Sequence, residues 1–134
     1  MREAQGEKMD RETLLTLLDQ WESVYKKGLL TFWLLLLLHE RPMYVFEMGQ
    51  ELDTISQGTI TADEKSLYRA LRRFEAMGLV QSSWQPSDLG PRRRYYHLTE
   101  LGTELLRRFT RRNILSFQEP AVAARLEALL LEDE

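Results

Sequence analysis

Cysteine is absent from this chain of 134 residues, and histidine occurs only twice. The lack of cysteine excludes disulfide bonds, thiolate nucleophiles and every metal site built on thiolate ligands. His39 and His97 lie far apart and lack the spacing of a metal site or of a nucleophile with its base. We therefore predict no catalytic residue, no metal and no cofactor, and a binding protein instead of an enzyme.

The chain also lacks a hydrophobic run long enough to cross a membrane. Its most apolar stretch, residues 29–38, is about half of the roughly 20 residues that a bilayer requires. The first ten residues carry charges before any apolar run, which is not the pattern of a secretory signal. We expect a cytoplasmic protein without a membrane partner.

An excess of basic residues is missing as well, because 21 Asp and Glu outweigh 18 Lys and Arg for a formal charge of -3. The distribution is uneven. Residues 63–112 carry a net charge of +5, whereas residues 1–27, 28–62 and 113–134 carry -1, -3 and -4. The central basic segment is compatible with a polyanionic partner such as nucleic acid.

Apolar residues at spacings of three and four predict six helices, and two apolar-polar segments around a Pro/Gly loop at 86–91 predict a β-hairpin. Gly28 is expected to end the first helix, and Thr61 with Glu64 to form a capping box for the fourth. The expected helices cover 9–25, 29–39, a segment from 44, 61–77, a segment from 99 and a segment from 120. A hairpin after such helices is the order of a winged helix-turn-helix, so the predicted fold class is mainly α with a β-hairpin wing.

The predicted fourth helix has one cationic face and one apolar face. At about 100° per residue, its cations fall on the side opposite Leu67, Leu71 and Phe74. The major groove of DNA admits one helix, whose Arg and Lys bond base edges or phosphates. The candidate DNA contacts are Lys65, Ser66, Tyr68, Arg69, Arg72 and Arg73. A solvated basic face is the alternative for this helix alone, and a packing role is the alternative for Tyr68.

Arg92, Arg93 and Arg94 follow the loop of the predicted hairpin. Alternate residues of a strand point to opposite faces, so at most two of the three share a face. Cations near a loop tip suit phosphate or minor-groove contact, and a solubilised strand edge is the alternative. Together with the basic helix, they favour double-stranded DNA as the partner.

A third basic cluster, residues 107–112 of the predicted fifth helix, is not assigned to DNA. Glu104 lies one turn from Arg107 and Arg108 and is placed to pair with them. We interpret these arginines as part of a solvated, internally paired surface.

Several short motifs occur together between residues 67 and 102: Leu67–Leu71, Arg73–Glu75, Gly78–Val80, Gly90–Tyr96 and Leu98–Gly102. Their combination resembles the PadR family of winged-helix transcriptional regulators, over roughly residues 29–108. Val45 is a departure, because the family commonly has glycine at that place.

The resemblance implies a homodimeric repressor that binds a pseudo-palindromic operator through a winged-helix domain at 28–99. The N-terminal extension (1–27) and the C-terminal helices (100–134) would then form the dimer interface. The expected interface residues are Leu14, Leu17, Leu18, Trp21, Leu105, Phe109 and Phe117.

The extra N-terminal helix is also similar to that of clock-associated cyanobacterial regulators, which implies an action on clock-gene transcription. Some family members bind drugs or phenolic acids between subunits, but the residues name no effector here. The alternatives are a ligand-gated repressor and a protein-interaction module on a winged-helix dimer scaffold.

Overall fold

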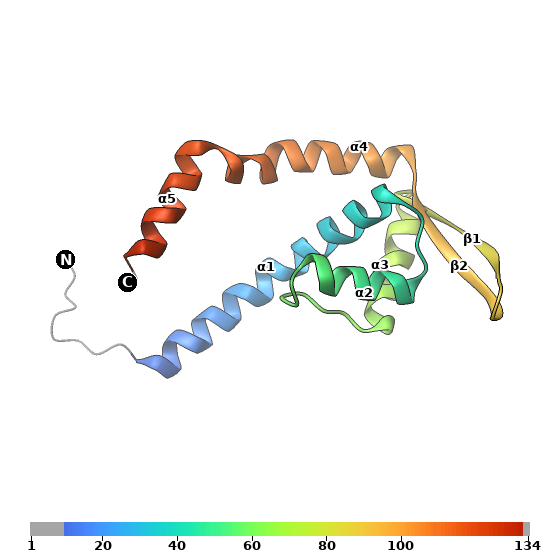
Figure 1. The fold of residues 1–134 in the computed structure, drawn as a ribbon, viewed down its shortest axis with the longest axis horizontal. Helices are drawn as coiled ribbons and strands as arrows, with labels where there is room; N and C mark the ends of the chain where they lie inside the picture. The colour runs from blue at the N-terminus through green and yellow to red at the C-terminus, as the bar shows by residue number, and fades with distance from the viewer. Residues whose placement is uncertain (1–9, 133–134) are drawn as a thin grey trace.

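The computed structural model describes residues 10–132. Over this range, helices and one two-stranded antiparallel sheet follow one another in the predicted winged-helix order (Figure 1). The elements are α1 (Arg11–Glu40), α2 (Val45–Ile55), α3 (Glu64–Ala76), β1 (Val80–Ser87), β2 (Gly90–Leu98), α4 (Glu100–Phe109), the π-helix η1 (Thr110–Ile114), the 3-10 helix η2 (Leu115–Gln118) and α5 (Pro120–Leu131). No described helix is long and apolar enough to span a membrane.

The first two predicted helices form one continuous helix, α1, so the prediction that Gly28 ends a helix is wrong. A glycine inside a helix costs only about 1 kcal/mol relative to alanine, and the good helix formers on both sides outweigh that cost. The predicted stop before Pro42 is confirmed, because Arg41 is extended and α1 ends at Glu40.

The hydrophobic core forms around the C-terminal part of α1. Leu34, Leu35, Leu37 and Leu38 are at most 3% exposed, so this segment is buried on more than one side. The helices α2 and α3, the base of the hairpin and α4 all contribute side chains to this core; the most deeply buried include Met48, Leu52, Leu67, Leu71, Phe74, Val80 and Tyr96. This packing fixes α3 and the hairpin on one rigid support.

The hairpin projects from this core as the wing (Figure 1). Its strands pair from Val80 opposite Leu98 to Ser87 opposite Gly90, so the turn is shorter than the predicted loop at 86–91. At the base of the wing, Met43 and Tyr96 exchange two backbone hydrogen bonds of 3.1 and 2.8 Å. The wing root is therefore joined to the segment that precedes α2.

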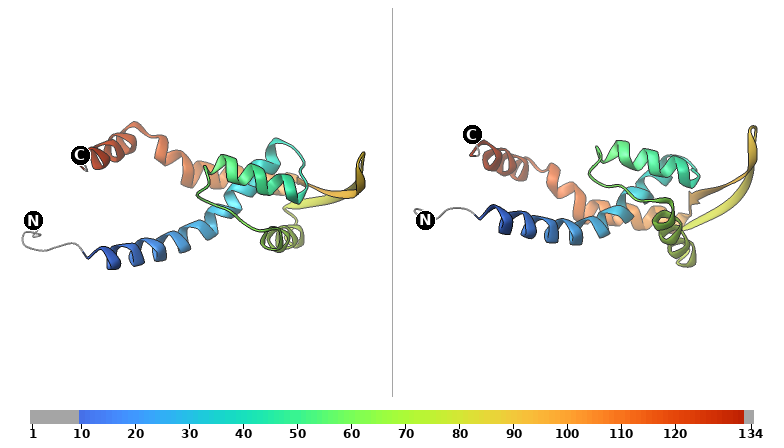
Figure 2. Two further views of the ribbon diagram at one scale, coloured as in Figure 1. Left: turned by 60° about the horizontal axis from the view of Figure 1, so that its bottom comes forward. Right: turned by 90° about the horizontal axis from the view of Figure 1, so that it is seen from below.

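The N-terminal part of α1 and the helix α5 extend on the side opposite to the wing in every view (Figures 1 and 2). Residues 11–25 of α1 are all exposed, and α5 contains no buried residue. Two apolar arms of this kind leave a large hydrophobic surface uncovered on the single chain.

Gly102 sits where α4 starts against the end of α3. Thr99 caps α4 by accepting a hydrogen bond of 3.0 Å from the Gly102 amide, while its own amide donates to the Leu79 carbonyl. A Cβ on Gly102 would collide with that carbonyl and lie 2.8 Å from Leu98 Cδ2. The close approach of α4 to the chain after α3 thus requires glycine.

We predict that Gly102→Ala lowers the free energy of unfolding by about 1–3 kcal/mol, the usual cost of overpacking a core. Gly28→Ala is the matched control, since nothing lies within 4 Å of a Cβ there; it is expected to stabilise the helix by about 0.5–1 kcal/mol. Urea denaturation followed by circular dichroism measures both. Equal effects of the two substitutions would contradict the role assigned to Gly102.

Candidate nucleic-acid interface

The helix α3 begins at Glu64 and is capped by Asp63, so the predicted capping box of Thr61 and Glu64 is wrong. The Asp63 carboxylate accepts a hydrogen bond of 2.8 Å from the Ser66 amide. Thr61 precedes the helix by too many residues for this role, because a cap must stand directly before the first helical residue. The hydrogen bonds from Ser66 lower the pKa of the Asp63 carboxyl below 3.8.

The predicted division of α3 into two faces is confirmed. Leu67, Ala70, Leu71 and Phe74 are at most 4% exposed and pack into the core. The polar side chains of the opposite face are exposed, with Tyr68 at 43%, except that Ser66 is half-buried. The exposed cations are Lys65, Arg69, Arg72 and Arg73.

These four cations have no anionic partner within residues 10–132. The ion pairs of that range involve Lys26, Arg41, Arg94, Arg107 and Arg108 instead. Arg73 lies with its guanidinium carbon 5.6 Å from the centre of the Phe74 ring. Because no carboxylate of the described residues lies within 4.0 Å of their charged nitrogens, the α3 cations form a surface of positive potential suited to a polyanion.

The three wing arginines divide between the two faces of the hairpin, as strand alternation predicts. Arg92 and Arg94 lie on the face of Trp84, with guanidinium carbons 6.0 and 5.9 Å from the centre of that ring. Arg93 lies on the other face, where its Nη1 donates a hydrogen bond of 3.0 Å to the Tyr44 hydroxyl. The wing arginines therefore have different surroundings, which sequence adjacency does not reveal.

Two arginines of the third basic cluster, Arg107 and Arg108, are paired with Glu104, as expected. Glu104 lies 3.0 Å from the Arg108 Nε and 3.8 Å from the Arg107 Nη1. The hydrogen bond from Arg108 also lowers the pKa of the Glu104 carboxyl. Arg111 and Arg112 of the cluster make no ion pair with a residue of the described range.

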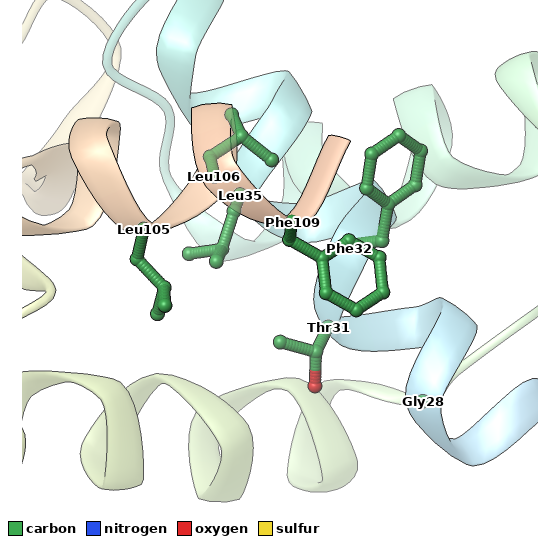
Figure 3. A pocket seen from close by; sticks show the side chains of 7 residues that line it. All are labelled: Gly28, Thr31, Phe32, Leu35, Leu105, Leu106 and Phe109. Carbon is green, nitrogen blue, oxygen red and sulfur yellow. The ribbon is translucent and has the colours of Figure 1, made fainter. Parts of the chain in front are cut away.

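The predicted interface residues are all exposed on the single chain, but they do not form one patch. Leu105 and Phe109 of α4 line a pocket of about 100 Å³ against α1, where the rings of Phe32 and Phe109 lie 6.0 Å apart (Figure 3). Leu14, Leu17, Leu18 and Trp21 lie on the N-terminal arm of α1 instead, and Phe117 lies in η2; their exposed fractions range from 45% to 75%.

Comparison with known proteins identifies this arrangement of helices and wing. The sequence model of the PadR-like family of transcriptional regulators matches residues 34–108. The chain belongs to the PadR-like family. Its winged helix-turn-helix fold is thereby confirmed, and so is the prediction that it is not an enzyme, because the members of this family are transcriptional regulators.

Solved structures show the same fold. A PadR-like transcriptional regulator from Bacillus cereus is 29% identical with a TM-score of 0.59, and the match covers 78% of this chain and 93% of that one. A PadR family regulator from Eggerthella lenta is 23% identical with a TM-score of 0.61, over 89% and 96% of the two chains. PadR of Bacillus subtilis, solved in complex with operator DNA, is 16% identical with a TM-score of 0.55, over 60% and 46%.

Two residues of this PadR-like regulator that contact the wing arginines, Tyr44 and Glu75, were not among the predicted site residues. Glu75 Oε1 lies 3.4 Å from Arg94 Nη2, and Tyr44 accepts from Arg93. A hydrogen bond between residues 49 positions apart leaves no periodic signal in the sequence. No cluster of three potential metal ligands occurs in the described part of the chain.

We predict that the Asp63 cap of this regulator is lost in acid. A carboxyl whose pKa is depressed on folding stabilises the protein fully above its unfolded pKa, near 3.8, and loses that contribution as the pH falls through the lower folded pKa. Asp63→Asn is the control, because asparagine caps without titrating. Carbon-detected NMR titration should place the Asp63 midpoint below 3.8, and the stability difference between the two proteins should change only in that acidic range. A midpoint at or above 3.8 would contradict the assignment of the cap.

Proposed function

We propose that this PadR-like regulator is a homodimeric, sequence-specific DNA-binding repressor. The observation that carries the proposal is the exposed row of cations on α3, which form no ion pair with another described residue and lie on a helix whose apolar side is packed in the core. A helix with this division of charge fits a major groove with its cations toward base edges and phosphates. The operator complex of Bacillus subtilis PadR, which shares the fold, supports this use of the winged helix.

Each α3 is proposed to enter one major groove through Lys65, Ser66, Arg69, Arg72 and Arg73, with Tyr68 at the flank against phosphate. The wing then lies over the adjacent backbone or minor groove. Two copies related by a twofold axis would read two half-sites about one helical turn, roughly 34 Å, apart on a pseudo-palindrome.

The dimer is supported by the apolar surface that the single chain leaves exposed. Trp21 is 75% exposed, and Leu17 beside it on the arm of α1 is 57% exposed. Exposed leucines of α5 add to this surface, among them Leu129 and Leu130 at 62% and 69%. Since large apolar patches rarely remain open to water on a monomer, we propose that a second copy of the chain covers these arms.

Two finer parts of the proposal rest on the family resemblance. The resemblance of the N-terminal helix to that of clock-associated regulators supports a proposed action on clock-gene transcription, and we propose a cytoplasmic location for the same regulator. The pocket between Phe32 and Phe109 is the observation that favours the second candidate, a repressor gated by a small apolar ligand. The third candidate, a protein-interaction module, would be excluded by sequence-specific DNA binding.

We predict that operator affinity falls steeply with salt. If each subunit neutralises about three or four phosphates, the slope of log K against log salt is expected near -5 to -7, because each contact contributes about -0.9. The measurement is fluorescence anisotropy of a labelled duplex that the wild-type protein selects from random DNA. A slope near zero, or failure to select any sequence, would exclude the proposed function.

The matched variants for that experiment are Arg72→Ala and Arg108→Ala. Arg72 of α3 makes no ion pair within residues 10–132, and its loss should cost about 1–3 kcal/mol for a base contact or reduce the slope by about 1 per subunit for a phosphate contact. Arg108 is held by Glu104 on α4, so its removal should leave affinity and slope close to wild type. Equal losses would indicate unspecific attraction to the whole basic segment.

We predict that Trp21→Glu dissociates the dimer. A charge at the centre of the exposed apolar arm leaves a carboxylate to be desolvated in the interface, so the dissociation constant should rise about thirtyfold or more. Phe46→Glu is the control, because Phe46 is 55% exposed but lies on α2, outside the proposed interface. Sedimentation equilibrium measures both. A wild-type monomer, or a Trp21→Glu dimer of unchanged affinity, would contradict the proposed interface.

A further inference from the structure

The outer part of the wing has almost no buried surface to fix its direction. Val80 and Tyr96 at the base are 1% and 3% exposed. Beyond them, every residue from 83 to 93 is exposed except Ser87, which is half-buried. Because an isolated two-stranded hairpin is only marginally stable, the direction of the tip depends on the polar contacts made by its two faces.

On the face toward α3, Arg94 is the centre of a closed set of polar contacts. Its Nε donates a hydrogen bond of 2.9 Å to the Ser82 hydroxyl of β1, and that hydroxyl donates one of 2.9 Å to Glu75 Oε2. The Arg94 Nη2 reaches Glu75 Oε1 at 3.4 Å. Glu75 belongs to α3, so this network joins both strands of the wing to the helix that carries the proposed groove contacts.

Two aromatic rings confine the Arg94 guanidinium. Its carbon lies 5.9 Å from the centre of the Trp84 ring and 5.5 Å from that of Tyr96. Two of the five guanidinium donors are thus held by a hydroxyl and a carboxylate, and two aromatic rings flank the group. The direction of the Arg94 side chain is therefore fixed by contacts within the protein.

The opposite face of the wing has a second attachment. The Arg93 guanidinium carbon lies 4.5 Å from the centre of the Tyr44 ring, and its Nη1 donates 3.0 Å to the Tyr44 hydroxyl. Tyr44 is the residue directly before α2, and its ring also meets Tyr95 edge-on at 5.4 Å. Arg93 therefore attaches β2 to the start of α2.

Arg92 differs from both neighbours. Within residues 10–132 its side chain makes no hydrogen bond or ion pair, and its guanidinium carbon lies 6.0 Å from the centre of the Trp84 ring. It is exposed and stands closest of the three to the turn. Its donors are therefore available to a partner.

From these contacts we propose that the three wing arginines have separate functions, which rest on the DNA binding proposed above. Arg94 with Glu75, and Arg93 with Tyr44, are positioning residues that hold the wing between α3 and α2 at the angle needed for operator binding. Arg92 is the wing arginine that contacts the DNA backbone. Glu75, an acidic residue of α3, thereby promotes the binding of a polyanion.

This role of Glu75 can be separated from simple electrostatics. Glu75→Gln removes a negative charge from α3, which by charge alone should strengthen DNA binding. Loss of the attachment should instead weaken it, by about threefold to tenfold, in line with a partly exposed ion pair and its hydrogen bonds. Anisotropy with the duplex selected by the wild-type protein gives the sign of the effect.

Glu64→Gln is the matched control, because Glu64 stands in the first turn of the same helix. The Glu64 side chain makes no hydrogen bond or ion pair with another described residue. It removes the same charge without touching the wing, so binding should be unchanged or about twofold tighter. The proposal would be overturned if the Glu75→Gln protein bound DNA as tightly as the Glu64→Gln protein.

A second readout tests the position of the wing without DNA. Arg94 contacts both Glu75 and Trp84, so Glu75→Gln is expected to move the indole ¹H–¹⁵N signal of Trp84, whereas Glu64→Gln is expected to leave it in place. An unmoved Trp84 signal in a folded Glu75→Gln protein would also overturn the proposal. Thermal unfolding establishes that each variant is folded.

Arg92 is tested by the salt slope. Arg92→Ala in the wild-type background should reduce the slope by about 2 for the dimer, because each subunit loses one phosphate contact. In the Glu75→Gln background the same substitution should have a smaller effect, since the misplaced wing has already lost that contact. Equal effects in the two backgrounds would contradict the coupling between Glu75 and Arg92.

Tyr44→Phe supplies an independent variant, because it keeps the ring under Arg93 and removes only the accepting hydroxyl. We expect about threefold weaker operator binding. Unchanged binding would remove Arg93 and Tyr44 from the proposal. A wild-type protein that selects no DNA would refute the proposed function itself, whereas wild-type binding with tighter Glu75→Gln binding would refute only the role of the wing residues.

Discussion

The burial of one short segment of α1, Phe32–Leu38, is the constraint on which the rest of the structure depends. Most of its side chains are removed from water, and α2, α3, the wing root and α4 each pack against the core that it forms. Burial of that many leucines supplies the main favourable free energy of a domain this small. The same packing holds α3 rigid, with its apolar side inward and its cations outward.

The continuity of α1 links the core to the proposed dimer. A helix of 30 residues is about 45 Å long, and half of it lies outside the domain as an arm. Because the helix has no break at Gly28, the arm continues directly into the segment that forms the core. The distance between two α3 helices in a dimer would therefore be set by how two arms pack, and not by a flexible linker.

The faces of α3 could be predicted from sequence alone because helical geometry assigns each residue an angle. The positions of Leu71 and Arg72 follow from that geometry without knowledge of any distant residue. The sequence places the start of the helix at Thr61, because Thr61 and Asp63 lie close together and offer similar caps, and only the backbone path selects Asp63. Gly28 is predicted to end a helix because its own helix propensity is poor, whereas the good helix formers on both sides outweigh that cost.

By itself the sequence determined the order of helices and wing, the cationic face of α3, the pairing of Glu104 with Arg108 and the resemblance to PadR-like regulators. Each depends on residues close together in the chain, or on a pattern that can be recognised in the amino-acid sequence itself. The tertiary structure alone decided that Arg94 is held by Glu75, that Arg93 is held by Tyr44 and that Gly102 cannot bear a side chain. These depend on segments that meet only after the core has formed, so three identical arginines in a row acquire different surroundings.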